Sequence, residues 1–196
     1  TTRWLSPTSP TSHLIFHYRP QNTNEIMAKN LNSKCKLCRR AGEKLFLKGE
    51  RCFSQKCAMN RRPFAPGQHG QAQRRGGSEF GRQLAMKQKI KRLYGVMERQ
   101  FRNHYAEAEK RHGITGDELM GRLERRLDNV VYRLGFASSR AQARQLVSHK
   151  MFSLNGKRMN VPSAEVKMGD VIALKDTKKN KTYFVQIQEN LKNKNN

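Results

Sequence analysis

The sequence predicts an α+β fold, in which a metal-bearing N-terminal arm and a helical domain precede a helix–helix–β-hairpin module. Four cysteines lie close together in residues 34–81, a stretch with almost no apolar periodicity. Farther along, apolar residues recur three or four positions apart, which is helix spacing. The dipeptide Asn155-Gly156 then predicts a hairpin. We divide the chain into an unassigned extension (1–26), an N-terminal domain (27–121), the module (122–188) and a disordered tail (189–196).

The first 26 residues differ from the rest of the chain. They hold little charge and many Thr, Ser and Pro residues, and the basic region opens abruptly at Met27. A secretory signal is not indicated, because the apolar stretch 14–16 is short and no basic cluster precedes it. A leader such as a transit peptide, a tag and upstream read-through are the open interpretations. We expect the segment to be disordered or peripheral.

All four cysteines belong to the core-poor stretch. Cys35 and Cys38 are separated by two residues, and Cys52 and Cys57 follow after a loop that contains Gly49. This spacing is typical of a tetrahedral metal site, and the flanking cations favour thiolates. We expect one structural Zn²⁺, with an iron–sulfur cluster on the same four cysteines as the alternative. Two disulfides, which suit secreted chains, and four unpaired thiols are the other interpretations.

Residues 61–77 mix cations with Pro and Gly and predict an extended arm. Gly lets a backbone approach RNA closely, and Arg can bind phosphate or stack on bases. Taken alone, the same composition is also typical of a solvated linker.

Three helices are expected in the middle of the chain. The first spans about 82–112 and ends at Gly113, and the second spans about 117–134 and ends at Gly135. The third begins at Ser138 or Ser139 as its N-cap and ends near His149. The first helix carries a basic cluster, which favours RNA over a membrane surface or an acidic partner. This cluster consists of Lys87, Lys89, Lys91 and Arg92.

A hairpin is expected after the third helix. Its strands are 151–154 and 157–159, because Asn155-Gly156 readily takes the positive φ angles of a type I′ turn. Pro162 limits the pairing of the second strand. Residues 171–174 and 183–187 predict two further strands.

The charge of the chain indicates its partner. Of the 196 residues, 40 are Lys or Arg and 15 are Asp or Glu, for a formal net charge of +25. Nucleic acid is the expected partner, since each neutralised phosphate releases condensed counterions. No membrane partner is expected, because no run approaches the roughly 18 to 20 apolar residues that span a bilayer. The histidines lack a paired nucleophile, and no phosphate loop or dinucleotide motif is present, so neither an enzyme nor a small-molecule substrate is expected.

Three segments closely resemble the bacterial small-subunit ribosomal protein S four family. They are RRLDNVVYRLG at 125–135, FASSRAQARQLV at 136–147 and LNG at 154–156. The resemblance extends to YGVMERQF at 94–101, PGQHG at 66–70 and the four cysteines, and covers about 27–174. Phe64 stands where the family often has Tyr, and the segment after 187 is poorly matched.

The resemblance implies a structural constituent of the small ribosomal subunit. Proteins of this family bind the 5′ domain of 16S rRNA early and nucleate assembly of the 30S subunit. They lie beside proteins S three and S five near the mRNA entry channel, where they affect translational accuracy, and some repress translation of their own mRNA. The helix–helix–hairpin would then be the RNA-binding module named after the family, also called the alpha-L motif. The expected location is the cytoplasmic ribosome, with an organellar ribosome as the alternative.

Mapped onto matching positions, the resemblance implies two sets of RNA contacts, while Asp128 is expected to brace an arginine. The set in the module is Arg125, Arg126, Ser138, Arg140, Arg144, Lys150, Asn155, Lys157 and Arg158. The set in the arm is Arg39, Arg40, Arg61, Arg62, Gln68, His69, Arg74 and Arg75. The main rival function is an RNA-modifying enzyme or synthetase that borrows the same module, but the rest of the sequence leaves no room for a catalytic domain. A free-standing translational repressor is the second rival.

Overall fold

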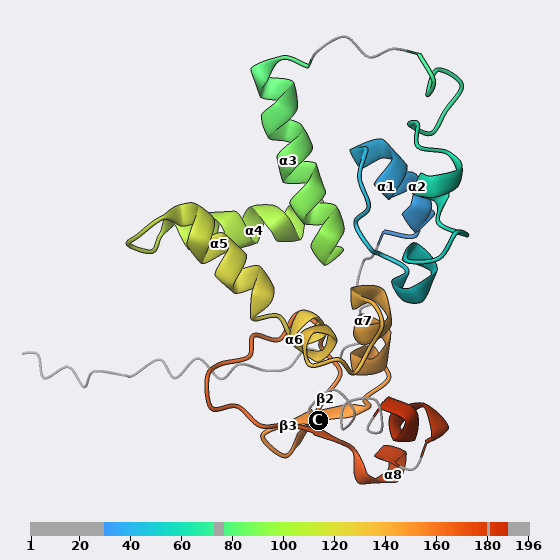
Figure 1. Cartoon of the computed structure of the whole chain (residues 1–196). Coiled ribbons are helices and arrows are strands. Elements are labelled where there is room, and N and C mark those ends of the chain that lie inside the picture. Colours follow the sequence, from blue (N-terminus) through green and yellow to red (C-terminus); the bar gives the residue numbers. More distant parts are fainter. Residues whose placement is uncertain (1–29, 73–76, 180, 188–196) are drawn as a thin grey trace, which may run out of the picture.

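The structure is a computed structural model that describes residues 30–72, 77–179 and 181–187 (Figure 1). The extension 1–26, the tail 189–196 and the arm residues Arg74 and Arg75 lie outside the described residues. In the cysteine arm the elements are α1 (Lys34–Ala41), the 3-10 helix η1 (Gly49–Cys52) and α2 (Ala58–Arg61). The helical part contains α3 (Glu79–Tyr94), α4 (Glu98–Glu109) and α5 (Thr115–Glu124). The module contains α6 (Leu127–Arg133), α7 (Arg140–Ser148), β1 (Phe152–Leu154), β2 (Lys157–Met159), β3 (Ile172–Leu174) and α8 (Asp176–Lys179).

The single helix expected over 82–112 is wrong, because the chain turns at Gly95. Gly95 adopts a left-handed φ of 65°, and its backbone N–H bonds to the carbonyl of Lys91, which caps α3. A left-handed residue at this position ends a helix, and glycine adopts it without a Cβ clash. The turn lets α4 fold back, so that Tyr94 and Phe101 bury their rings in one cluster.

The helix expected over 117–134 is also divided. The α5 helix ends at Glu124, and α6 begins at Leu127. Between them the backbone pairs with a distant segment: the Leu127 N–H donates to the Ala164 carbonyl at 2.8 Å, and the Val166 N–H donates to the Arg125 carbonyl at 2.8 Å. These tertiary bonds replace the helical bonds of the break and join α6 to the segment that follows the hairpin.

Among the described residues, two small hydrophobic cores hold the fold together. One lies between α3, α4 and α5, and the other lies between α6, α7 and the sheet. The first contains Tyr94, Val96, Phe101, Ala108, Leu119 and Leu123. The second contains Leu127, Val131, Ala137, Ala143, Val147, Phe152 and Phe184. Each fully buried Leu, Val or Phe contributes roughly 1.5–3 kcal/mol relative to an exposed one, so both cores are substantial despite the low apolar content.

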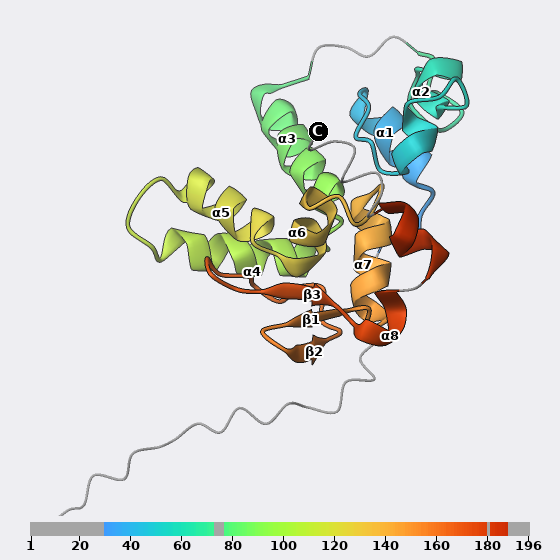
Figure 2. The same cartoon turned by 60° about the horizontal axis from the view of Figure 1, so that its bottom comes forward.

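The predicted third helix and hairpin are confirmed. The α7 helix begins after Ser139, whose hydroxyl accepts the Gln142 N–H at 3.3 Å. The antiparallel sheet has the order β2-β1-β3, and Phe152 pairs with Met159 across the hairpin. Asn155 and Gly156 have φ values of 50° and 75°, as a type I′ turn requires. Figure 2 shows the three strands as one small sheet below α6.

The strand predicted at 171–174 is confirmed as β3, but the strand predicted at 183–187 is wrong, because residues 182–187 are helical. Phe184 is buried in the module core, where its ring meets Phe152 edge-on with centroids 6.3 Å apart. The Tyr183 hydroxyl donates to the Phe136 carbonyl at 3.0 Å. A helical turn brings Tyr183, Phe184 and Ile187 onto the same core, which an extended strand would not do. Within the described part of the chain, no helix combines the length and apolarity needed to cross a membrane.

Candidate nucleic-acid interface

The four cysteines gather around one cavity of about 20 Å³. Cys35 and Cys38 lie one turn apart on α1, Cys52 ends η1, and Cys57 is the N-cap of α2. All four are free thiols, so the disulfide interpretation does not hold in this structure. Burial raises the pKa of the Cys38 thiol, and the nearby charges of the other three thiols raise it further. The predicted clustering of the four cysteine side chains is therefore confirmed.

The donor set fits a soft metal ion, since four thiols that surround one cavity match the ligand chemistry of zinc and iron–sulfur centres. The ligand geometry is not preformed, because among the described residues no three His, Cys, Asp or Glu side chains are arranged to hold a metal ion. A cysteine cluster is thus established in the arm.

Arg39 joins α1 to the extended segment that follows α2. Its Nε donates to the Phe64 carbonyl at 2.9 Å, and its Nη2 donates to the Ala65 carbonyl at 3.3 Å. The guanidinium also lies 5.0 Å from the centre of the Phe64 ring. The Arg39 guanidinium is therefore engaged in contacts within the protein, which leaves less of it available to RNA than was expected. The remaining described candidates of the arm are exposed, namely Arg40, Arg61, Arg62, Gln68 and His69.

Most cations predicted on α3 hold neighbouring helices. Lys87 and Lys91 both bind the carboxylate of Glu98 on α4, at 2.5 and 2.9 Å. Hydrogen bonds from these two ammonium groups lower the pKa of Glu98 to about 2. Lys89 pairs with Glu43 at 2.9 Å. Arg92 has no carboxylate partner among the described residues and lines a groove between the arm, α3 and α7.

The RNA contact predicted for Arg126 needs correction. Arg126 is only 2% exposed and forms a two-pronged ion pair with Asp128, with Nε–Oδ1 and Nη2–Oδ2 distances of 3.1 and 2.8 Å. The break between α5 and α6 turns this side chain inward, which helical periodicity alone does not predict. The expectation that Asp128 braces an arginine is confirmed. Neighbouring Arg125 remains at the surface, where it pairs with Glu118 and Glu165.

Arg140 and Arg144 fasten α7 to the end of α3. The Arg140 guanidinium lies 5.0 Å from the Tyr94 ring centre and 4.7 Å from that of Tyr132. Arg144 donates from Nη1 to the Gly95 carbonyl at 3.1 Å, and burial lowers the pKa of Arg144. Both arginines are therefore held in fixed orientations that join the module to the N-terminal helices.

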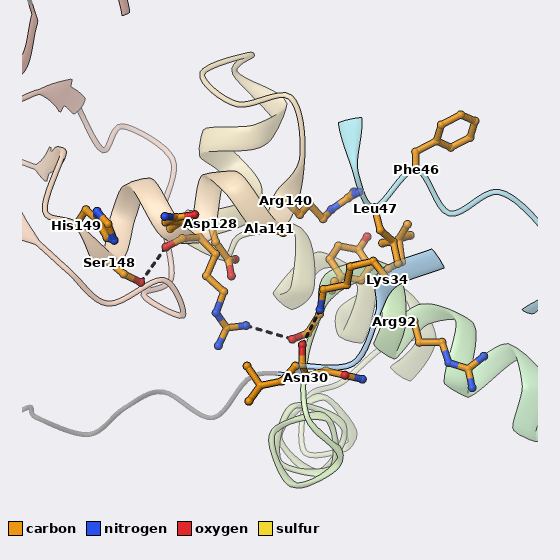
Figure 3. A pocket seen from close by; sticks show the side chains of 16 residues that line it. Asn30, Lys34, Phe46, Leu47, Arg92, Asp128, Arg140, Ala141, Ser148 and His149 are labelled. Carbon is orange, nitrogen blue, oxygen red and sulfur yellow. Dashed lines mark hydrogen bonds between the residues drawn. The ribbon is translucent and has the colours of Figure 1, made fainter. Parts of the chain in front are cut away.

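The groove of about 530 Å³ lies where the cysteine arm, α3 and α7 meet. Its lining includes residues 30–31, Lys34, Phe46 and Leu47 of the arm, the end of α3, and one face of α7. Figure 3 shows Lys34 and Arg140 between Arg92 on one side and His149 on the other. The acidic side chain in the lining is Asp128, which Arg126 already neutralises. The groove thus gathers cations from three segments distant in sequence.

The hairpin end of the module presents further cations. The expected residues Lys150, Lys157 and Arg158 are exposed, and none has a carboxylate partner among the described residues. The side chain of Asn155 instead braces the loop before β3: its Nδ2 donates to Asp170 at 2.9 Å, and its Oδ1 accepts the Val171 N–H at 2.9 Å. Ser138 is exposed, and its hydroxyl donates to Gln142 at 2.8 Å.

A polar network around Glu124 was not predicted from the sequence. The Tyr94 hydroxyl donates to this carboxylate at 2.5 Å, Asn129 donates at 2.6 Å and Arg133 donates at 2.8 Å. Burial raises the pKa of Glu124, but the three donors outweigh it and lower that pKa to about 2. Asn129 also accepts from the Arg140 Nε at 2.8 Å, so the network continues to the groove. Asn129 and Arg133 are four positions apart on α6, but no spacing in the sequence links them to Tyr94 or Arg140.

Comparison with known proteins identifies the family. Residues 29–124 match the ribosomal protein S4/S9 N-terminal domain, and residues 125–172 match the S4 domain. The chain is 59% identical over 163 residues to the small ribosomal subunit protein uS4 of Caldicellulosiruptor bescii, which covers 83% of this chain and 78% of that protein. The same-named protein of Syntrophomonas wolfei is 53% identical over the same shares. The chain belongs to the uS4 family.

Membership of the uS4 family confirms the resemblance of the sequence to small-subunit ribosomal proteins. The chain is a structural constituent of the small ribosomal subunit and not an enzyme. The α+β fold is confirmed as well, since a helical domain precedes a small sheet and an S4 domain. The ribosome is therefore its place in the cell, and the basic groove is its candidate interface with nucleic acid.

Proposed function

We propose that this uS4 chain binds ribosomal RNA of the small subunit through the groove between the arm, α3 and α7. The observation that carries the proposal is the charge of the groove: Lys34, Arg92, Arg140 and Arg144 line it, while its acidic group is already paired. Cations of this kind attract the phosphates of RNA and release counterions. The exposed cations of the arm and of the hairpin would add further phosphate contacts.

The proposed contacts fall into two classes. Arg92, Lys150, Lys157 and Arg158, together with Arg40, Arg61 and Arg62 of the arm, would neutralise phosphates, because they are accessible and lack a carboxylate partner among the described residues. Arg140 and Arg144 would position the RNA strand, because contacts within the protein hold their guanidinium groups in fixed orientations. Gln68 and His69 are exposed and could contact base edges or 2′-hydroxyl groups.

The preformed groove supports an early role in assembly. Tyr94, Glu124, Asn129 and Arg140 already connect the N-terminal helices to the module, so RNA binding would not need to order them. A preorganised surface binds with a smaller entropic cost. We therefore propose that the chain is a primary binder of the 5′ domain of 16S rRNA and nucleates 30S assembly, with 27–121 and 122–188 as its two RNA-binding units.

The family resemblance supports the wider setting of this proposal. We place the chain beside proteins S three and S five near the mRNA entry channel, in a bacterial cytoplasmic ribosome, with effects on translational accuracy. Repression of its own mRNA would use the same basic surface. The four clustered thiols support one structural Zn²⁺, or an iron–sulfur cluster in its place, as the element that orders the core-poor arm.

Competition binding tests the RNA proposal. The full chain is titrated with a 5′-domain fragment of 16S rRNA in the presence of heparin, and its contacts are mapped by footprinting. Arg92→Gln should weaken binding and reduce the magnitude of the salt slope by about one, as for a lost phosphate contact. Arg99→Gln on α4, where Arg99 is exposed and has no carboxylate partner among the described residues, is the matched control with the same charge change. Equal affinity for rRNA and for heparin, or equal effects of both substitutions, would refute the proposal.

A further inference from the structure

Two phenylalanines of the cysteine arm form an exposed stacked pair. The rings of Phe46 and Phe53 lie with their centroids 5.1 Å apart and their planes 28° from parallel. Phe46 is 42% exposed and Phe53 is 76% exposed, so the stack does not serve to fill a core. Large aromatic rings that remain in water next to each other indicate a surface kept for a partner.

The backbone holds this pair in place at a conformational cost. Phe46 has a φ of 50°, which is a rare conformation for a bulky residue and indicates a functional constraint. Gly49 lies between the two phenylalanines in the sequence and packs so closely against the module that an added Cβ would lie 2.7 Å from the Ser138 hydroxyl oxygen. The Lys48 N–H also bonds to the buried Cys52 sulfur at 3.4 Å. The loop that carries the rings is therefore fixed between the cysteine cluster and α7.

The surroundings of the pair are strongly basic. Over residues 44–56 the exposed cations are Lys44, Lys48, Arg51 and Lys56, against the single acid Glu50. Protein–protein interfaces are depleted in lysine, whereas nucleic-acid sites combine aromatic rings with cations. Phe46 also lines the groove and is labelled there in Figure 3, and Phe53 stacks on Phe46, so the pair lies at the edge of the proposed RNA path.

We propose that Phe46 and Phe53 form a platform on which an unpaired base of RNA stacks. The inference rests on the proposed function and adds a base contact that is independent of sequence, since every base offers a flat π-face. Phe53, the more exposed ring, would meet the base directly. Phe46 would support it from behind, and the neighbouring lysines would hold the adjacent phosphates.

Substitution at Phe53 tests the platform in the full chain, with the same 5′-domain rRNA fragment as the probe. Phe53→Ala should raise the Kd roughly 5- to 150-fold, which is the range for the loss of one stacked base. Phe53→Tyr should retain the wild-type affinity, because it keeps the ring. The salt slope should stay unchanged in both variants, because no phosphate contact is lost. Phe80→Ala on α3, where Phe80 is 73% exposed, is the control for loss of an exposed ring.

The outcomes separate this inference from the proposed function. If the wild-type chain does not prefer the rRNA fragment over heparin, both fail. If the wild type prefers rRNA but Phe53→Ala binds equally well, the platform alone is refuted, and the pair would then belong to a protein contact. A reduced salt slope, an equal loss in Phe80→Ala, or no recovery in Phe53→Tyr would also refute it. Ultraviolet crosslinking of the rRNA to the 45–56 peptide gives a second, affinity-independent readout and is expected to depend on Phe53.

Discussion

Removal of Asp128 should reveal how strongly the interior of the module depends on one ion pair. Arg126 is 2% exposed and Asp128 is 4% exposed, and two hydrogen bonds of 3.1 and 2.8 Å join them. The Nη1 of Arg126 has no hydrogen-bond partner among the described residues. Asp128→Ala would therefore leave an entire guanidinium buried without a counter-charge, which costs about 3–5 kcal/mol. This is a large part of the 5–15 kcal/mol that is typical of a folded protein.

Urea unfolding followed by circular dichroism measures this loss. The matched double variant, Arg126→Met with Asp128→Leu, replaces the pair by apolar groups and should recover most of the stability. Because Arg126 lies inside the module, the double variant should also bind rRNA with the wild-type salt slope. A loss below about 1 kcal/mol in Asp128→Ala would contradict the burial of the ion pair, and a reduced salt slope in the double variant would contradict the inward orientation of Arg126.

Three further changes probe the polar network around Glu124, the contact between α3 and α7, and the cysteine cluster. The pKa of Glu124 is lowered from 4.5 to about 2, so its stabilising effect is complete above about pH 4.5 and is lost as the pH falls through about 2. Glu124→Gln should therefore be less stable than the wild type at neutral pH, and its urea unfolding midpoint should change less with pH between about 4.5 and 2. Arg140→Met should cost about 2–4 kcal/mol, from two cation–π contacts and one charged hydrogen bond, and Arg140→Lys should restore little of it in the same assay. Cys38→Ala or removal of metal by a chelator should unfold the arm and weaken rRNA binding; an unchanged circular dichroism spectrum together with unchanged affinity would contradict the metal proposal.

Features with local causes were predictable from the sequence. Ser139 caps α7 with its own hydroxyl, and Asn155 with Gly156 forms the hairpin turn through its own φ preferences. The convergence of the cysteines was also predictable, because four soft ligands at short spacings have few other uses in a core-poor segment. In each case the residues that carry the signal also form the structure.

Features with tertiary causes were not predictable in the same way. The division between α5 and α6 depends on backbone bonds to the segment around Ala164, which lies far along the chain. Residues 183–187 alternate like a strand, but five residues are too few to distinguish a strand from a helical turn, and the burial of Phe184 against Phe152 decides for the helix. The same limit applies to the site: an arginine is visible in the sequence, but its direction is not. For this reason the sequence did not predict that Arg126 points inward to Asp128, or that Lys87 pairs with Glu98.

The contact between the end of α3 and α7 determines which substitutions should matter most for RNA binding. Arg144 holds the carbonyl of Gly95, and Arg140 lies against Tyr94, so the position of the module cations relative to the N-terminal cations is set by contacts within the protein. Under the proposed function, an exposed cation such as Lys157 would contribute one phosphate contact, and its loss should lower affinity while the other contacts stay in register. Loss of Arg140 would instead let the two sets of cations move apart, so that several contacts lose their alignment at once. Its effect on rRNA affinity should therefore exceed that of Lys157→Gln, although both substitutions remove one positive charge.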